Sequence, residues 1–178
     1  ETSGEAGTAL VKLGEGGWRR RLHEALVDGR IALVAFPVRD AGGRLMHLEC
    51  PLRVQLEQDG ILEPAARWLP LAVRARLTAA LDERALALAL SAIDDDGQPR
   101  AVNLAIGTLA DSGFASRLRA QLLQSPRAAR QVWLEVPEAA AADHFELVRE
   151  LGRQLRPTGA RLGLEHAGER LSRVERLF

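Results

Sequence analysis

Four oxygen-bearing side chains interrupt apolar segments of this sequence, and their types are suited to binding chemistry. Glu49 lies in HLECP, Asn103 in AVNLA, Glu135 in WLEVP and Glu165 in GLEHAG. Carboxylate and amide oxygens are ligands of hard divalent cations, and they also accept hydrogen bonds from donor-rich ligands. Each side chain alone is explained as well by a bond to nearby backbone at a strand end. Because all four occupy the same relative place, we favour one shared site.

The segments around these side chains have the length of β-strands and alternate with helical segments. From residue 101 onward, strands are predicted at 101–106, 131–136 and 161–166, and helices at 111–124 and 139–156. This alternation is typical of βα units around a parallel sheet. The carboxyl ends of parallel strands form the binding face of such folds. We therefore expect the four side chains at one mouth.

The first half of the chain is expected to add two strands, at 31–38 and 45–54, and two Ala/Leu-rich helices divided near Thr78. The strand 45–54 is unusual because a proline, which cannot donate to a β-ladder, follows its carboxylate by two residues. An eight-stranded α/β barrel takes about 250 residues. The five predicted strands fit an α/β fold, and if that fold is barrel-like, it is incomplete at the C-terminus, with a last strand open to another chain.

The net charge and the cysteine content indicate which kinds of partner and compartment to expect. The 178 residues include 24 basic and 24 acidic side chains, so the net charge of zero gives no indication of nucleic-acid binding. The single cysteine, Cys50, excludes an internal disulfide framework and favours a reducing, cytoplasmic compartment. Residues 1–16 are rich in Gly and Glu and are interpreted as a linker. Residues 17–178 are interpreted as one domain.

Seven segments, in the same order and with similar spacing, resemble motifs of the EAL domain family of cyclic di-GMP phosphodiesterases. ECPLR resembles the motif E-A-L-hydrophobic-R, VNLAIGTLAD resembles I-N-L-S, and LEVPE resembles L-E-hydrophobic-T-E. LEHAGERLS lies where the family has D-D-F-G-T-G-Y-S, and AFPV where it has F-Q-P-hydrophobic. RWLPLAV and LDERALALAL resemble the segments between these motifs. The resemblance implies a TIM-barrel-like EAL fold.

The departures from these motifs bear on activity. In active family members, residues matching Glu49, Asn103, Glu135 and the first Asp of the D-D pair hold cations that activate a water. Here Glu165-His166 replaces the pair. One added methylene moves a carboxylate further than the roughly 0.5 Å that catalytic sites tolerate. The resemblance therefore implies a degenerate domain with no catalytic residues and no cofactor, similar to inactive receptor modules of the LapD and FimX kind.

The same resemblance implies which residues bind cyclic di-GMP. They are Phe36, Glu49, Arg53, Leu69, Pro70, Asn103, Glu135 and Glu165. Arg53 is expected on a ligand phosphate, where charge-assisted bonds favour arginine. Phe36 replaces the family glutamine, and either stacks on a guanine or packs in the core.

Two alternatives remain open at this point. One is a phosphodiesterase with Mg or Mn at an atypical Glu165-His166 site, and the other is a scaffold that binds no nucleotide. The expected partners are cyclic di-GMP, a neighbouring GGDEF-like domain in the parent chain, and a second copy or another protein, but no nucleic acid. The expected location is the cytoplasm, including the cytoplasmic part of a membrane-anchored protein.

Overall fold

The computed structural model describes residues 14–168, 171–174 and 177. Most of the predicted linker 1–16 therefore lies outside the described residues, and α2 begins within its last two positions. None of the described helices has both the length and the apolar character needed to traverse a lipid bilayer.

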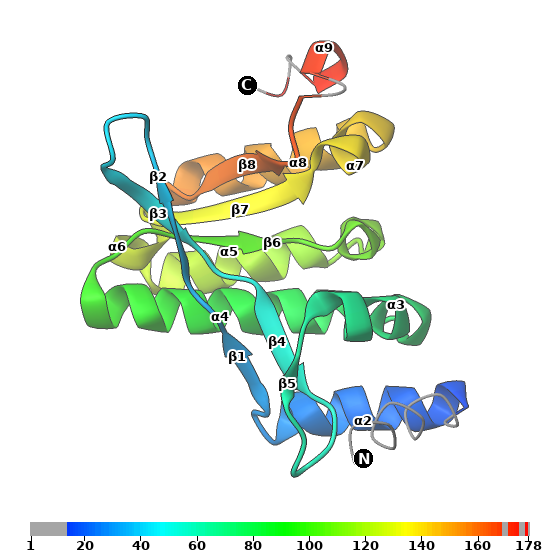
Figure 1. Cartoon of the computed structure of the whole chain (residues 1–178). Helices are drawn as coiled ribbons and strands as arrows, with labels where there is room; N and C mark the ends of the chain where they lie inside the picture. The colour runs from blue at the N-terminus through cyan, green and yellow to red at the C-terminus, as the bar shows by residue number, and fades with distance from the viewer. Residues whose placement is uncertain (1–13, 169–170, 175–176, 178) are drawn as a thin grey trace.

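The chain alternates between strands and helices after an N-terminal hairpin region (Figure 1). The strands are β1 (Ile31–Leu33), β2 (Phe36–Arg39), β3 (Leu45–Glu49), β4 (Leu52–Gln55), β5 (Leu62–Glu63), β6 (Arg100–Asn103), β7 (Val132–Pro137) and β8 (Arg161–Glu165). The helices are α2 (Glu15–Val27), α3 (Ala65–Ala75), α4 (Thr78–Asp96), α5 (Phe114–Gln124), α6 (Pro126–Ala129), α7 (Glu138–Asp143), α8 (Phe145–Leu155) and α9 (Leu171–Val174). Short 3₁₀ turns cover Ile106–Ala110 and Arg156–Thr158.

Five strands form the main sheet in the order β2-β3-β6-β7-β8. β3, β6, β7 and β8 are parallel, and β2 is antiparallel to β3. The arrowheads of β6, β7 and β8 consequently point to the same end of the sheet in Figure 1. Within the described residues β2 and β8 are the edges, so the sheet is open. The expected α/β, barrel-like and incomplete arrangement is confirmed.

The prediction of two long strands, at 31–38 and 45–54, is wrong in one respect: each segment divides into two shorter strands. Pro51 has no N–H to donate, and it follows the last residue of β3 by two positions. The facing strand breaks at the same level, since Leu33 pairs with Leu52 and Phe36 with Glu49. The hairpin thus leaves the main sheet here and enters a second sheet of order β1-β4-β5.

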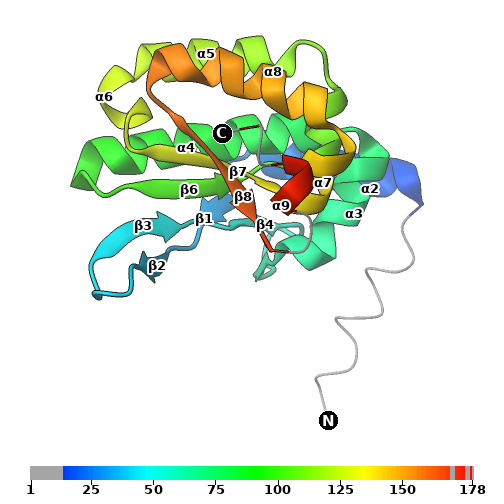
Figure 2. The same cartoon turned by 90° about the horizontal axis from the view of Figure 1, so that it is seen from above.

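Helices α4, α5 and α8 lie on one face of the main sheet (Figure 2). Because neighbouring side chains of a strand point to opposite faces of the sheet, alternate residues of each strand face these helices. In β7, Val132, Leu134 and Val136 are fully buried in the helix-covered core. Trp133 and Glu135 therefore point to the opposite face, which we call the site face.

Two predicted helices differ from the observed ones at their ends. The predicted helix 139–156 divides into α7 and α8 at His144, whose backbone is not helical (φ −124°, ψ 41°). The predicted helix 111–124 begins at Phe114, because Asp111 accepts the Gly113 N–H with its side chain and forms a turn before the helix. The predicted division near Thr78 is confirmed by α3 and α4.

Candidate functional site

The four residues predicted to share a mouth are brought together at the carboxyl end of the main sheet. Glu49 ends β3, Asn103 ends β6 and Glu165 ends β8, while Glu135 lies within β7. In the register of the sheet, Asn103 pairs with Glu135. The Asn103 Nδ2 donates to Glu165 Oε1 at 3.3 Å, across the intervening β7. We call these four residues the mouth cluster.

A glycine in β8 makes room for the Glu135 side chain. Gly163 pairs with Glu135. A Cβ atom on Gly163 would lie only 2.9 Å from the Glu135 Cγ and 3.2 Å from its Oε1. The Glu135 carboxylate therefore lies over the backbone of β8, on the side where Glu165 also ends its strand.

The mouth cluster is electrostatically unfavourable as it stands. Burial raises the pKa of Glu135, and the neighbouring Glu49 and Glu165 carboxylates raise it further. The Asn103 Oδ1 is buried and accepts no hydrogen bond within the described part of the chain. Buried polar atoms of native proteins are rarely left without partners. The cluster therefore combines excess negative charge with an unused acceptor, which is the arrangement that a hydrogen-bond donor would complete.

His47 belongs to the same face and was missed by sequence reasoning. Its side chain is 11% exposed, its ring centroid lies 5.4 Å from that of Trp133, and its Nε2 is 3.9 Å from Glu135 Oε1. Burial lowers the pKa of His47, although Glu49 opposes the shift. The sequence did contain a signal, because His47 and Glu49 are two residues apart on one strand and so share a face.

Trp133 links His47 to β8. The Arg161 guanidinium lies 4.9 Å from the centroid of the Trp133 ring. The His47 ring of β3 and the Trp133 ring of β7 meet across β6. The β6 residue that pairs with Trp133 is the small Ala101. His47, Trp133 and Arg161 therefore form a connected group on the site face, beside the mouth cluster.

Glu165 and His166, the pair expected at the atypical metal site of the phosphodiesterase alternative, lie at the end of β8. His166 Nε2 lies 3.3 Å from Glu165 Oε1, the same oxygen that accepts from Asn103. His166 has a left-handed backbone (φ 52°) and a side chain that is 85% exposed. In the described ranges of the chain, no group of three or more His, Cys, Asp or Glu side chains is arranged to hold a metal ion.

The remaining predicted site residues lie on other elements than β3, β6, β7 and β8. Phe36 pairs with Glu49 across β2 and β3 and is 48% exposed, so the alternative that it packs in the core is wrong. Leu69 and Pro70 lie on α3, where Leu69 packs partly against the core formed by α2, α3 and β4, and Pro70 is exposed.

Arg53 lies in β4, in the second sheet, and pairs with Ala32. Its guanidinium has no hydrogen bond or ion pair within the residues that the structure describes. Arg53 follows Glu49 by four positions, and an extended chain of that length spans at most about 14 Å. Arg53 is therefore an uncommitted cation a short stretch of chain after Glu49, but in a different sheet.

Comparison with known proteins gives one family. The family model for the EAL domain matches residues 19–178. No curated protein matches the chain. Three similar solved structures are Vibrio cholerae LapD S helix-GGDEF-EAL bound to c-di-GMP, the Xanthomonas citri FimX EAL domain in complex with c-di-GMP, and the PaMucR phosphodiesterase in complex with c-di-GMP.

These structures share the fold of the chain at low sequence identity. LapD is 18% identical with a TM-score of 0.83, over 93% of this chain and 42% of that one. FimX is 21% identical with a TM-score of 0.78, over 92% and 65% of the two chains. PaMucR is 24% identical with a TM-score of 0.74, over 89% and 68%. The chain thus spans less than half of the LapD chain and about two thirds of the FimX chain.

Proposed function

Since this chain belongs to the EAL domain family, we propose that it binds cyclic di-GMP at the mouth cluster without a metal and without hydrolysing it. In this proposal the domain is a receptor or interaction module of a signalling protein. The LapD, FimX and PaMucR structures, in which c-di-GMP is the bound ligand, support this choice of ligand.

The observation that carries the proposal is the set of free acceptors at the mouth. The Asn103 Oδ1 is unpaired, and three carboxylates crowd the same place with a raised pKa at Glu135. A guanine base presents an exocyclic amine as a hydrogen-bond donor. Donors of this kind would satisfy Asn103 and relieve the repulsion among the acids, and no metal is required for that.

The phosphates of the ligand need a cation, and Arg53 is the candidate. Its guanidinium is uncommitted in the described part of the chain. Arginine binds phosphate with paired, charge-assisted hydrogen bonds. Phe36 is exposed beside Glu49 and would stack on a base. The ligand would then join the main sheet, through the mouth cluster, to the second sheet, through Arg53.

A receptor must change something when it binds, and the proposed connection between the two sheets is where that change would begin. A ligand shifts a conformational equilibrium only as far as it binds one state better than the other. A GGDEF-like domain in the parent chain is the proposed recipient, since the similar LapD structure contains one. A second copy or another protein is the proposed further partner, and the cytoplasm is the proposed location.

Product analysis tests the proposal against the phosphodiesterase alternative. The protein is incubated with cyclic di-GMP and Mg²⁺ or Mn²⁺, and intact and linear dinucleotide are separated by chromatography. We expect bound, intact ligand and no linear product. Linear product that disappears in a Glu49→Ala variant would instead establish a metal-dependent enzyme with an unorthodox Glu165-His166 site.

A further inference from the structure

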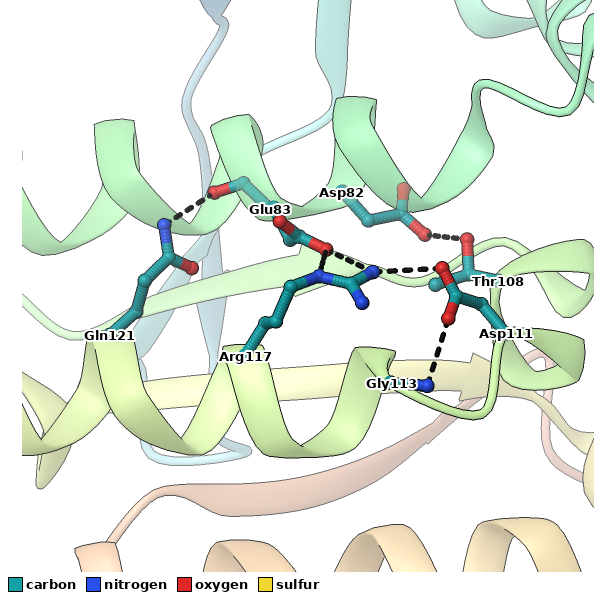
Figure 3. Close-up of polar contacts among 7 residues, drawn as sticks. All are labelled: Asp82, Glu83, Thr108, Asp111, Gly113, Arg117 and Gln121. Atoms are coloured by element: carbon teal, nitrogen blue, oxygen red, sulfur yellow. Dashed lines mark hydrogen bonds and ion pairs between the residues drawn. The ribbon is translucent and has the colours of Figure 1, made fainter.

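A buried carboxylate outside the mouth cluster is the feature with no assigned role. Asp82 lies on α4, is 5% exposed, and is the second residue of the LDERALALAL segment. Its Oδ2 accepts two hydrogen bonds, from the Ala105 N–H at 2.9 Å and from the Thr108 hydroxyl at 2.6 Å. Figure 3 shows Asp82 and Thr108 facing each other from two different elements.

Both donors belong to the stretch that follows Asn103. Residues 104–113, which we call the β6–α5 segment, connect the mouth end of β6 to α5. Leu104, the first of them, donates its N–H to the Glu135 carbonyl oxygen at 2.8 Å. Ala105 then donates to Asp82. The backbone just after Asn103 is thus fixed on one side to β7 and on the other to α4.

A buried carboxylate at position 82 costs folding free energy, because burial disfavours its charged form. Burial raises the pKa of Asp82 to about 7, although the hydrogen bonds from Thr108 and Ala105 oppose the shift. The neighbouring positions of α4 are apolar core residues such as Leu81, Ala85 and Leu86. An apolar residue would pack there at lower cost, but it would leave two buried donors of the β6–α5 segment without an acceptor.

The far end of the same segment is held in a different way. Glu83 accepts from the Arg117 Nε at 2.8 Å, and the Arg117 Nη2 donates to Asp111 at 2.8 Å (Figure 3). These three side chains are partly exposed to solvent. Adjacent residues of α4 therefore hold the two ends of the segment, and only Asp82 acts beside Asn103.

We propose that Asp82 is a positioning residue for the mouth cluster, which fixes the β6–α5 segment so that Asn103 faces Glu165 and keeps its Oδ1 free for the ligand. This inference rests on the proposed function, because it assigns Asp82 to the same site. Asp82 itself does not contact the ligand. It acts through the backbone of Leu104 and Ala105.

The test compares the full chain with four variants, using cyclic di-GMP in the presence of a chelator as the ligand. Asp82→Ala removes the acceptor, Asp82→Asn keeps an acceptor oxygen, Thr108→Val removes one donor, and Glu83→Gln is the matched control one residue away. We expect Asp82→Ala to weaken binding about tenfold. Asp82→Asn should restore binding to within about threefold, and Glu83→Gln should bind as the wild type does.

The second readout does not depend on the ligand. The side-chain amide signals of Asn103, observed by NMR, should shift in Asp82→Ala and in Thr108→Val but not in Glu83→Gln. If Asp82→Ala does not fold, Thr108→Val carries the decision, because it removes one bond at nearly constant volume.

The outcomes separate this inference from the proposed function. Unchanged Asn103 signals in the folded variants would overturn the positioning role, whether or not the ligand binds. Wild-type affinity in Asp82→Ala, with only a lowered unfolding midpoint, would also overturn it and leave Asp82 a stabilising residue. A wild-type protein that binds no cyclic di-GMP, with Asn103 signals that still move as expected, would contradict the proposed function alone.

Discussion

The polar residues at the two ends of β6 differ in their hydrogen bonding: Arg100 is paired with a carboxylate, and Asn103 has an unused acceptor. At the first residue, Arg100 donates to both oxygens of Asp96, each at 2.7 Å, and these bonds lower the pKa of Asp96 to about 2. At the last residue, Asn103 has an unused oxygen beside a carboxylate whose pKa is raised. The strand has only four residues, so the contrast arises over a very short distance.

This contrast separates the part of the sheet that stabilises the fold from the part that is free to bind. In parallel α/β folds, residues at the amino ends of the strands serve stability and residues at the carboxyl ends serve function. Arg100 is nearly buried and fully paired. The mouth cluster is left with unmatched acceptors and like charges, which stable folds avoid unless a ligand completes them.

The largest expected effect is on binding. Arg53→Ala should weaken the affinity for cyclic di-GMP by about 1.5–3 kcal/mol, the range for a hydrogen bond to a charged group. Its unfolding midpoint should stay near that of the wild type, because Arg53 has no ion pair in the described residues. Isothermal titration calorimetry and thermal unfolding measure the two quantities.

Arg149→Ala is the matched control for Arg53→Ala. Arg149 is an exposed residue of α8, where it pairs with Glu146. The Arg149→Ala variant should bind cyclic di-GMP with the affinity of the wild type. Equal affinities in Arg53→Ala and the wild type would argue that the phosphates do not lie at β4.

The next effect is on stability at the opposite end of β6. Arg100→Ala should lower the unfolding midpoint by about 3 °C, the scale of a lost interaction of roughly 1 kcal/mol in a domain of this size. The affinity of the folded protein for cyclic di-GMP should not change, because Arg100 lies at the far end of the strand. Differential scanning calorimetry tests the first part. A large loss of affinity in this variant would mean that the two ends of β6 are coupled.

The smallest effect concerns charge in the mouth cluster. The folded-state pKa of Glu135 is raised, so its carboxylate destabilises the folded protein as the pH rises above the ordinary value near 4.5. Glu135→Gln should therefore be more stable than the wild type at pH 7, by about 0.5 kcal/mol. The gain should vanish below the ordinary pKa, where the wild-type carboxyl is protonated in both states.

Urea unfolding of Glu135→Gln and the wild type at pH 4 and pH 7 measures this difference. Ligand affinity should fall in the same variant, since an acceptor charge is lost. A variant that is less stable at pH 7 would contradict the interpretation of the mouth cluster as a strained site.

Sequence reasoning located the mouth cluster correctly because its signal is local. Glu49, Asn103, Glu135 and Glu165 each interrupt an apolar run, and parallel strands bring their carboxyl ends together. The family motifs reinforced this placement. His47, two residues before Glu49, carried a weaker form of the same signal. It was not assigned to the site, because Glu49 matched the family motif and His47 did not.

The features that were missed depend on contacts between distant segments. The division of the strand 45–54 depends on the antiparallel partner that breaks at the same level, and this partner cannot be read from Pro51 alone. The placement of Arg53 in the second sheet follows from that division. Asp82 resembled an ordinary helix residue in the sequence, because its partners Ala105 and Thr108 are more than twenty positions away.

Titration calorimetry of cyclic di-GMP into the protein, with EDTA and then with Mg²⁺, tests the central claim most directly. We expect saturable binding with the same affinity in both conditions, and recovery of intact ligand afterwards. Binding that appears only with Mg²⁺ would contradict metal-free recognition by the mouth cluster. No heat in either condition, confirmed by equilibrium dialysis with labelled ligand, would leave the chain as a scaffold that binds no nucleotide.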